Sequence, residues 1–519
     1  MSAAKTTPPF PMAVPRDQDV FAAIDEFIGA LGSNAVATDS EDIAGFVAGI
    51  TLPPGRLTCI AAIVSPSSAE QVQAVVIIAN RHRIPLWPST GDRNHGHGLL
   101  APCAPGSVIM DLRRMNRVLE IDEECAYAVV EPGVSFFDLY EHLRAGGYSL
   151  MMPVPELACG SVINHVLEGG SSPQPCGLEA VMANGGLVRT GMGALSASKA
   201  WHTYRLSPGP ASDNLFLQTD LGIVTRMGVW LRPRPERYLS CTVRCRHDHD
   251  LALLVDTIRP FLLDGTISNH PVLFNLVSTA ARIAARDEWY LQDGVIPEAE
   301  LERIADETGI GRWNLRFALY GRHGVVEAQL AEVAVAFGKI AQSCLTYREY
   351  DGNAPEEDIH SGDKSQAGIP DTEVCQMSQW AGGATADYVT LSSVARLNSA
   401  EVVAQSELLR AGVEQHGFDH HGMLILSPRS VVHVICMPFD RTDTAQMEAA
   451  YSACDAMLAL ATMAGYGTHC PHGRYQDRIA TQFAFNDEGL QGLYSLIKDA
   501  VDPNGILPSG KVDVSPAIG

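Results

Sequence analysis

The chain lacks any long uninterrupted apolar stretch, although 46% of its 519 residues are hydrophobic. Glycine, proline or a charged residue interrupts the apolar stretches every few positions, whereas a helix needs about 20 apolar residues to span a bilayer. The proline-rich start, residues 1–15, also lacks the apolar core of a secretory signal. These absences predict a soluble, cytoplasmic protein without a membrane partner.

Basic residues are scarce relative to acidic ones. The chain has 37 Lys and Arg against 60 Asp and Glu, which gives a formal net charge of −23. A field of this sign repels the phosphates of nucleic acids and the headgroups of anionic lipids. We therefore expect no nucleic-acid partner, and a small molecule as the substrate.

Cysteine is sparse, with 12 residues scattered along the chain. A small secreted scaffold needs a much denser framework, so we expect most of these thiols to be reduced and buried. One local cluster, formed by Cys241, Cys245, His247 and His249, contains metal-ligand side chains. Its alternating spacing is typical of a strand with all four residues on one face, which favours no metal and leaves zinc as the alternative.

A chain of this length exceeds what one compact core normally needs and indicates two domains or subdomains. Near the start, residues 59–64 form an apolar run typical of a buried strand, and residues 84–88 return to an extended pattern. Between them, Ser67 with Glu70 three positions later predicts a helix N-terminus with a capping box. Two prolines within residues 232–236 mark a domain boundary.

Beyond that boundary, strand patterns are separated by long helical patterns, which predicts an antiparallel sheet backed by helices and an α+β fold overall. The strands are expected at residues 239–243, 315–320, 387–392 and 431–437, and the helices at residues 326–342 and 400–415. The segment 355–371 is rich in Asp, Glu, Gly and Ser and has little apolar content. It is therefore predicted to be a mobile surface loop.

A glycine-rich loop, residues 89–98 with the sequence STGDRNHGHG, follows the predicted strand, helix and strand. Its three glycines can adopt backbone angles closed to other residues and turn their amide groups toward one point, so the loop could cradle a diphosphate. Its spacing matches neither the dinucleotide fingerprint GxGxxG nor the phosphate loop GxxxxGK followed by Ser or Thr. An ordinary glycine-rich surface turn is the alternative interpretation.

Eight segments, in order along the chain, together resemble the vanillyl-alcohol oxidase and p-cresol methylhydroxylase family of FAD enzymes. They are RIPLWPSTG with the strand and helix before it, GSVIMDLRRMNRVLEID, AYAVVEPGVSFFDLYEHL, LVRTGMGAL, LGIVTRMGVWL, GRWNLRFALYG, RYQDRIATQF and DPNGILPSGK. The resemblance implies a bipartite FAD-binding domain, residues 1–235 with residues 475–519 returning to it. It also implies a substrate-covering cap domain, residues 236–474, which contains the antiparallel sheet flanked by helices.

The resemblance also implies that the glycine-rich loop binds the FAD diphosphate through backbone amides, while residues 222–224 line the adenine end. The family's flavin-linking side chain falls at Tyr388, which implies an O-tyrosyl link as one option. The more distant berberine-bridge-like oxidases offer His95 and Cys159 as another pair of linking residues. The cofactor-binding residues expected from these matches are Thr90, Gly91, Asp92, Arg93, Asn94, His95, Gly96, Gly98, Cys159, Gly160, Ser161, Gly222, Ile223, Val224, Tyr388 and Lys511.

In this family a phenol binds as its phenolate between two tyrosines and an arginine, and a hydride leaves its benzylic carbon for flavin N5. The matching positions here are His97, His469 and Cys470, and Glu156 matches the usual acidic residue beside the flavin. Pro173 stands where the family has a further tyrosine. Two imidazoles could still handle protons near neutral pH, but a thiol cannot replace the charge of an arginine. The four catalytic candidates therefore predict a pocket altered from simple para-alkylphenol chemistry.

The sequence thus predicts an FAD-dependent oxidoreductase, an oxidase or dehydrogenase, that takes a hydride from a small aromatic or phenol-derived substrate. The electron acceptor is expected to be dioxygen or an unknown partner, and the family implies a homodimer or larger homo-oligomer. The alternative is a redox-silent descendant that uses Glu156 and the histidines for acid/base isomerisation, elimination or cyclisation. A noncatalytic ligand-binding relic is a third interpretation.

Overall fold

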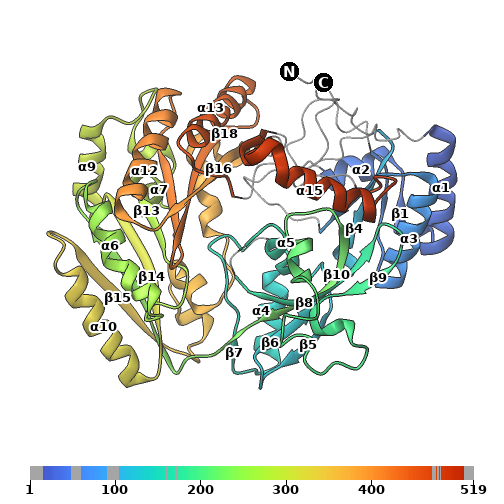
Figure 1. The fold of residues 1–519 in the computed structure, drawn as a ribbon. Helices are drawn as coiled ribbons and strands as arrows, with labels where there is room; N and C mark the ends of the chain where they lie inside the picture. Colours follow the sequence, from blue (N-terminus) through green and yellow to red (C-terminus); the bar gives the residue numbers. More distant parts are fainter. Residues whose placement is uncertain are drawn as a thin grey trace.

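The protein folds into two halves that lie side by side in the computed structural model (Figure 1). The structure describes residues 16–47, 60–90, 105–158, 160–170, 172–469, 475, 478–479 and 481–507. The first half holds a four-stranded and a five-stranded sheet, and the second half holds a seven-stranded sheet. Within the described ranges, no helix combines the length and the apolar content needed to cross a bilayer.

The four-stranded sheet contains the strand–helix–strand unit predicted near the start of the chain. Its order is β1 (Val36–Ala37), β2 (Ile60–Val64), β4 (Ser107–Asp111) and β3 (Leu86–Ser89), with β2, β4 and β3 parallel. All five residues of β4 are buried, as expected for a parallel strand covered on both faces. The helices α1 (Asp17–Leu31), α2 (Ser40–Val47) and α3 (Ala69–His82) belong to this part of the chain.

The predicted start of α3 was wrong by one residue. Ser68, not Ser67, is the N-cap, and its side chain accepts a hydrogen bond from the backbone N–H of Gln71. Ser67 instead donates its hydroxyl to Gln71 Oε1 at 3.0 Å. Two adjacent serines can each fill the cap position, and the contact with Gln71 selects between them.

The five-stranded sheet is antiparallel throughout. Its order is β5 (Val118–Asp122), β6 (Tyr127–Val130), β10 (Gly222–Trp230), β8 (Pro175–Met182) and β9 (Leu187–Arg189). The helices α4 (Phe136–Ala145) and α5 (Val162–Leu167) pack their apolar residues against it. A two-stranded ribbon of β7 (Leu150–Met151) and β11 (Arg232–Pro233) joins this region to the second half.

The end of the chain returns to the first half. Helix α15 (Phe485–Val501) lies across it in Figure 1, and the backbone N–H of Leu86 in β3 donates to Ile506 O at 2.7 Å. Ile506 and Leu507 are buried in the same core as α1 and α3. The N-terminal region and the C-terminal segment thus share one apolar core, while the predicted domain boundaries stay predictions.

The seven-stranded sheet of the second half confirms the predicted antiparallel sheet. Its order is β15 (Cys344–Asp351), β12 (Arg237–Cys245), β14 (Trp313–Gly321), β13 (Val272–Asn275), β17 (His421–Leu426), β18 (Ser430–Asp440) and β16 (Ala386–Arg396). Its core face is covered by α6 (Asp250–Leu263), α10 (His323–Phe337), α12 (Ser399–Gln415) and α13 (Thr444–Met463). Shorter helices, α7 (Leu276–Ala281), α8 (Arg286–Trp289), α9 (Glu298–Thr308) and α11 (Gln379–Gly382), surround the sheet. The α+β class is therefore confirmed.

The acidic segment 355–371 contains three short 3-10 helices, Glu356–Asp358, Ser361–Asp363 and Ser365–Ala367. Asp363 is buried there and accepts hydrogen bonds from the hydroxyls of Ser240 and Tyr350, both at 2.7 Å. Polar contacts of this kind compensate for the low apolar content of the segment. Its mobility stays a prediction.

The Cys and His cluster around residue 245 divides between core and surface. Strand β12 ends at Cys245, so the prediction of one strand face carrying all four residues was wrong. Cys241 and Cys245 are buried in the core, whereas His247 and His249 stack beyond the strand end with ring centroids 5.0 Å apart. In the part of the chain that the structure describes, no group of three or more His, Cys, Asp or Glu residues could hold a metal ion.

Candidate active site

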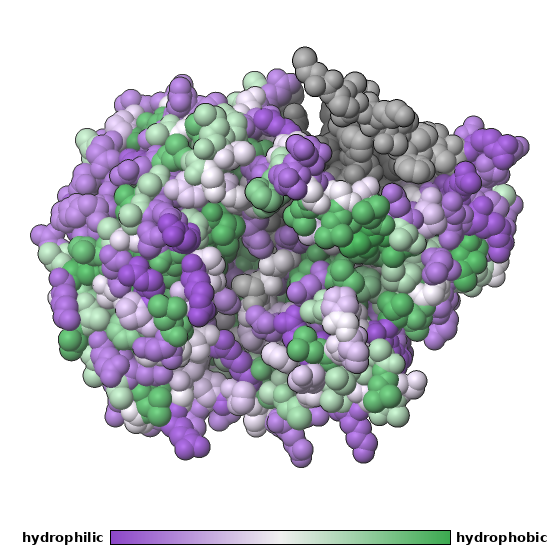
Figure 2. Space-filling model, in the orientation of Figure 1, coloured by the Kyte–Doolittle hydropathy of each residue, from purple (hydrophilic) through white to green (hydrophobic). Residues whose placement is uncertain are grey.

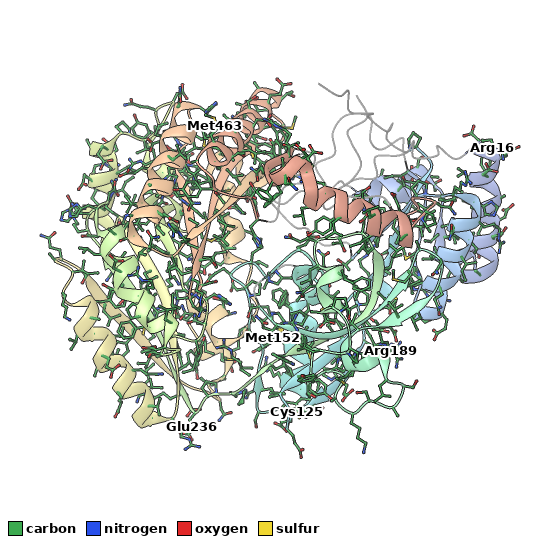
Figure 3. The ribbon with its side chains drawn as sticks, in the orientation of Figure 1. Arg16, Cys125, Met152, Arg189, Glu236 and Met463 are labelled. Carbon is green, nitrogen blue, oxygen red and sulfur yellow. The ribbon has the colours of Figure 1, made fainter. Side chains whose placement is uncertain are left out.

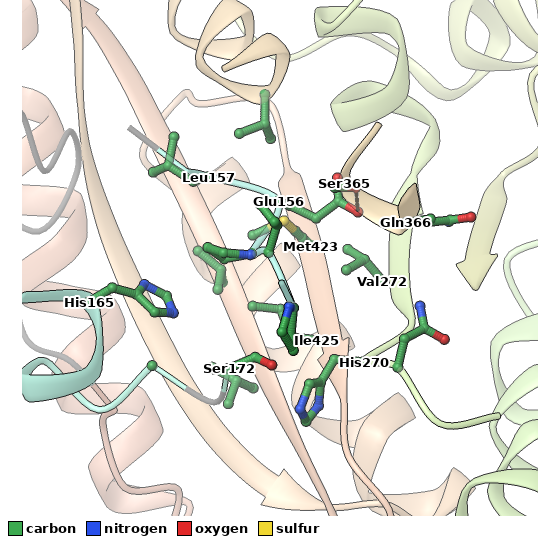
Figure 4. Close-up of a pocket in the computed structure, with 18 of the residues that line it drawn as sticks. Glu156, Leu157, His165, Ser172, His270, Val272, Ser365, Gln366, Met423 and Ile425 are labelled. Carbon is green, nitrogen blue, oxygen red and sulfur yellow. Dashed lines mark hydrogen bonds between the residues drawn. The ribbon is translucent and has the colours of Figure 1, made fainter. Parts of the chain in front are cut away.

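A cavity of 290 Å³ lies where the two halves meet. Figure 3 places Met152, one of its lining residues, at this junction, and Figure 2 shows the surface hollowed between the halves. Ligand pockets have volumes of about 300 to 1,000 Å³, so the cavity is near the lower end of that range. Figure 4 shows its walls, which come from both halves.

One wall is the face of the seven-stranded sheet opposite the helices. Side chains alternate between the two faces of a strand, so every second residue of three neighbouring strands faces the cavity. These residues are Tyr388, Thr390 and Ser392 of β16, Val432, Val434 and Cys436 of β18, and His421, Met423 and Ile425 of β17. The register places Thr390 opposite Cys436, and Cys436 opposite His421, so these three side chains form one row across the sheet.

The other lining residues come from the first half and from the segment after α13, which runs beside β16. They include the loop 151–157, His165, Gly170, Ser172 and His469. A methyl group added at Gly170 would collide with His165 Nε2, and one added at Gly169 would approach His469 Cε1 to 3.0 Å. The backbone N–H of His469 donates to Ser392 O at 2.8 Å, which ties this histidine to β16.

Glu156 is held in place by two side chains of the second half. Its carboxylate accepts hydrogen bonds from Arg316 Nη1 and Ser365 Oγ, both at 3.1 Å. Arg316, in β14, also donates to the carbonyl oxygen of Gly362. The side chains of Glu156 and Arg316 are only 17% and 10% exposed, so this is a largely buried ion pair that fixes the carboxylate on the cavity wall.

A second ion pair lies beside the first. Arg282 Nη2 is 3.3 Å from Glu373 Oε2, and the guanidinium lies 5.0 Å from the centre of the Phe274 ring. Burial, with a smaller contribution from nearby Arg316, lowers the pKa of Arg282 from its usual value. Two arginines and two carboxylates therefore form a compact group without net charge behind the cavity wall.

The structure brings together three of the residues predicted from the sequence. Glu156, Tyr388 and His469, which are far apart in the chain, all line the one cavity. Two catalytic candidates, His97 and Cys470, lie outside the described residues. Of the cofactor-binding candidates, Gly91, Asp92, Arg93, Asn94, His95, Gly96, Gly98, Cys159 and Lys511 also lie outside them.

The remaining cofactor candidates lie in the first half. Thr90 follows β3 directly, and Ser161 caps α5 by accepting a hydrogen bond from Asn164 N. The carbonyl of Gly160 accepts a hydrogen bond from Phe136 N at 3.3 Å. In β10, Ile223 and Val224 are buried in two different apolar cores, and an added methyl group at Gly222 would approach Phe216 to 2.9 Å. Any contact of these three residues with a ligand would therefore use their backbone atoms.

Sequence reasoning missed several residues of the cavity region, including Arg316, Ser365, His165 and His421. Arg316 had a detectable signal, because a charged residue in the middle of an otherwise apolar strand is seldom buried without a partner. His421 had none, since a histidine in a strand is more often an ordinary core residue. It is 1% exposed, and burial lowers its pKa to about 4.

The residues that line the cavity are chemically suited to contact the ring system of a flavin. Bare backbone at Gly170, the imidazoles of His165 and His469, and the Tyr388 hydroxyl stand around an otherwise largely apolar space. Such walls can contact a flat aromatic ring and hydrogen-bond its polar edge. Tyr388, Gly170 and the two histidines would therefore hold the flavin end of FAD.

The chain is similar in sequence and in fold to known FAD enzymes. The FAD binding domain family model matches residues 60–191. The chain is 30% identical over 499 residues to the flavoprotein subunit of 4-cresol dehydrogenase (hydroxylating) from Pseudomonas putida, covering 94% of each chain. It is 33% identical over 305 residues to 1'-carboxy-chondrochloren decarboxylase from Chondromyces crocatus, covering 56% of this chain and 55% of that protein. The structure superposes on 4-ethylphenol oxidase from Gulosibacter chungangensis with a TM-score of 0.90 and 31% identity, covering 98% and 99% of the two chains.

Proposed function

Because the chain belongs to the vanillyl-alcohol oxidase and p-cresol methylhydroxylase family of FAD enzymes, we propose that it oxidises a small, phenol-derived aromatic compound. Its substrate would differ from a simple para-alkylphenol, since His469 and Cys470 stand at positions where the family has a tyrosine and an arginine. The observation that carries the proposal is the meeting of Glu156, Tyr388 and His469 on one cavity. All three were selected from the sequence for roles next to the flavin.

The side chains of this protein would position the substrate and move its protons. FAD, when bound, supplies the acceptor for a hydride. His469 lines the cavity and can accept or donate a proton at an imidazole nitrogen near neutral pH. The carboxylate of Glu156, paired with Arg316 and hydrogen-bonded by Ser365, would be a fixed hydrogen-bond acceptor on the cavity wall. The largely apolar walls would exclude water from the reacting carbon.

Anaerobic mixing tests the proposal. The flavin-loaded protein is mixed without oxygen with a panel of 4-substituted phenols, and loss of the visible flavin absorption is followed. We expect at least one compound to bleach the flavin, and His469→Ala to slow bleaching about 100-fold or more if His469 is an acid or base. His249→Ala, at a side chain that is 78% exposed, is the matched control and should leave the rate unchanged. A flavin that no phenol reduces would rule out the proposed oxidation.

Covalent attachment at Tyr388 is a separate proposal, supported by the place of this residue on the cavity wall. Acid precipitation of the yellow protein should then leave the colour in the pellet. The variant Tyr388→Phe keeps the ring but lacks the linking oxygen, so its flavin should pass into the supernatant. Colour that stays in the pellet of Tyr388→Phe would assign the link to another residue, with His95 and Cys159 as the candidates.

A second candidate function is the decarboxylation of an aromatic carboxylate, favoured by the similarity to 1'-carboxy-chondrochloren decarboxylase. Release of carbon dioxide from 4-hydroxyphenyl carboxylates, measured together with the flavin absorption, separates the two candidates. Carbon dioxide released without flavin reduction would favour a redox-silent reaction in which a proton replaces the carboxyl group. Flavin reduction without carbon dioxide would favour simple oxidation.

The remaining proposals concern the electron acceptor, the oligomeric state, the cellular compartment and the domain boundaries. We propose dioxygen or an electron-transfer partner as the acceptor, a homodimer or larger homo-oligomer as the assembly, and the cytoplasm as the compartment. We also propose an FAD-binding domain of residues 1–235 and 475–519 and a cap domain of residues 236–474. Shared burial of Ile506 and Leu507 with α1 and α3 supports this division.

A further inference from the structure

One end of the cavity is polar. There the lining residues are Arg232, Asn269, His270, Tyr320 and Ser427, whereas the middle of the sheet wall is formed by apolar residues of β17 and β18. Figure 4 shows His270 with Ser172 toward the lower end of the view, away from Glu156 and Ser365. The cavity therefore joins an apolar body to a polar end.

This end is distant from Tyr388, the candidate for flavin attachment. Tyr388 pairs with Pro438 across β16 and β18, while Val432, six residues earlier in β18, is in register with Ile425 and Val272. Six residues of a strand span about 20 Å. His270 comes two residues before Val272 and lies further still, so the polar end is on the side of the cavity away from the proposed flavin attachment.

Among the described lining residues at this end, Arg232 is the one that carries a full charge. Its guanidinium donates to Ser268 Oγ at 3.2 Å and to the Ser268 carbonyl. Among the described residues it makes no ion pair, whereas Arg282 and Arg316 each pair with a carboxylate. An arginine without a carboxylate partner on the wall of a cavity is notable in a chain with 60 acidic and 37 basic residues.

The side chains next to Arg232 do not offset its charge with a carboxylate. The guanidinium acts on both Tyr320 and His270, lowering the pKa of each, although burial is the larger influence and raises the pKa of Tyr320 while lowering that of His270. Both side chains are therefore neutral near pH 7 and offer hydrogen bonds but no negative charge. His270 Nδ1 is 3.4 Å from Ser427 Oγ, and the Tyr320 hydroxyl donates to Gln366 O at 2.6 Å.

We propose that Arg232 binds a carboxylate carried by the aromatic substrate, at the end of the substrate that lies away from the flavin. A guanidinium presents paired N–H donors that match the two oxygens of a carboxylate. One uncompensated cation matches the single charge of a carboxylate better than the nearly double charge of a phosphate monoester. The aromatic part of the substrate rests on the proposed function. The new part of the proposal is the carboxylate at the other end of the substrate.

Ligand pairs of equal length test this assignment. The probes are 4-alkylphenols and the corresponding ω-(4-hydroxyphenyl)alkanoates with alkyl chains of increasing length. Binding is measured from the shift of the flavin absorption, which needs no turnover and so separates this test from that of the oxidation. We expect the carboxylate to bind about 10- to 100-fold more tightly than its neutral partner once the chain is long enough to reach Arg232.

Two variants locate the effect. Arg232→Met should remove the preference for the carboxylate and leave the affinity for the 4-alkylphenol unchanged. Arg234→Met is the matched control, because Arg234 is two residues away and does not line the cavity. Among the described residues, its side chain donates only to Tyr148 O and Asn353 Oδ1. If the wild-type protein binds both ligands with equal affinity at every chain length, the proposal is wrong. It is also wrong if the preference for the carboxylate persists in Arg232→Met or is lost in Arg234→Met.

Discussion

Arg316 stands within β14, where the three residues on each side of it are buried. Its charge is tolerated there because Glu156 and the carbonyl of Gly362 accept its hydrogen bonds. A buried pair of this kind adds little net stability, but removing one partner leaves an uncompensated charge. The pair therefore serves mainly to fix Glu156 against the cavity.

We predict that Arg316→Met lowers the free energy of unfolding by roughly 3 kcal/mol, because it leaves the Glu156 carboxylate without its cation. The double variant Glu156→Gln with Arg316→Met should regain much of that loss, since no lone charge remains. Urea unfolding of the two single variants and the double variant measures the coupling. Additive losses would show that the two side chains do not act as a pair.

Three buried histidines also affect how the protein binds protons. His420, His421 and His433 lie within two neighbouring strands or next to them, and burial lowers the pKa of His433 to about 3 and that of His420 well below its usual value. Both ring nitrogens of His433 lack a hydrogen-bond partner among the described residues. The folded protein therefore takes up no proton at His433 in weakly acidic solution.

This difference predicts a pH dependence of stability. An unfolded imidazole has a pKa near 6.5, so between about pH 6.5 and pH 3 the unfolded chain binds a proton that folded His433 does not, and stability falls as the pH is lowered. His433→Leu should reduce the loss of unfolding free energy between pH 7.5 and pH 5.0 by about 2 kcal/mol. Urea midpoints at the two pH values measure it. His249→Leu, at a side chain that is 78% exposed, should leave the pH dependence as it is.

At the scale of elements, β15 is connected tightly to the start of β12. The backbone N–H of Gly352, directly after β15, donates to Glu236 O at 3.0 Å, and an added methyl group there would overlap the carbonyl oxygen of Pro235. Both partners are backbone atoms that cannot rotate away. This contact fixes the point at which the chain enters the seven-stranded sheet.

We expect Gly352→Ala to lower the melting temperature and to reduce the free energy of unfolding by about 2 kcal/mol or more. Two backbone segments must separate to admit the methyl group. Gly324→Ala in α10 is the control, since an added methyl group there meets nothing within 4 Å. That variant should be unchanged or slightly more stable, because alanine favours a helix over glycine. Thermal unfolding followed by circular dichroism compares them, and similar melting temperatures would contradict the close packing.

At the scale of the whole molecule, described segments that are far apart in the sequence, α1 and residues 506–507, share one core. Ile506 and Leu507 are 1% and 3% exposed beside residues of α1, α3, β2 and β4. Lys498 of α15 lies 2.8 Å from Asp502 and 3.0 Å from Asp220, which joins the C-terminal segment to the chain before β10. The core of the first half therefore includes residues that follow the whole second half in the sequence.

We predict that Ile506→Ala lowers the free energy of unfolding by about 3 kcal/mol, because it leaves a cavity in the core of the first half. The destabilisation should therefore be confined to the first half. Hydrogen exchange should speed up in β2, β3 and β4 and remain unchanged in β16 and β18. Leu496→Ala, at a residue of α15 that is 70% exposed, should change stability by less than about 0.5 kcal/mol. Equal acceleration of exchange in both halves would contradict a separate core.

Sequence reasoning predicted the elements well where one periodicity dominated. The strands expected at residues 387–392 and 431–437 lie within β16 and β18, and the alternation along them separates the cavity-facing side chains from those that pack on α12 and α13. It failed where neighbouring residues were equivalent locally, as at the N-cap of α3, or where a strand ended early, as at Cys245. Local pattern specifies what a segment can form, but contacts with other segments decide its ends.

By itself, the sequence determined the α+β class, the antiparallel sheet of the second half, the family and therefore FAD as the cofactor. These depend on periodicity and on ordered motifs, which are properties of the chain. Only the tertiary structure decided that Arg316 anchors Glu156, that Tyr388 and His469 share one cavity, and that Arg232 stands at its far end without a carboxylate partner among the described residues. Distance and charge pairing between residues far apart in the chain arise only when the sheets and loops pack together, so no local pattern could contain them.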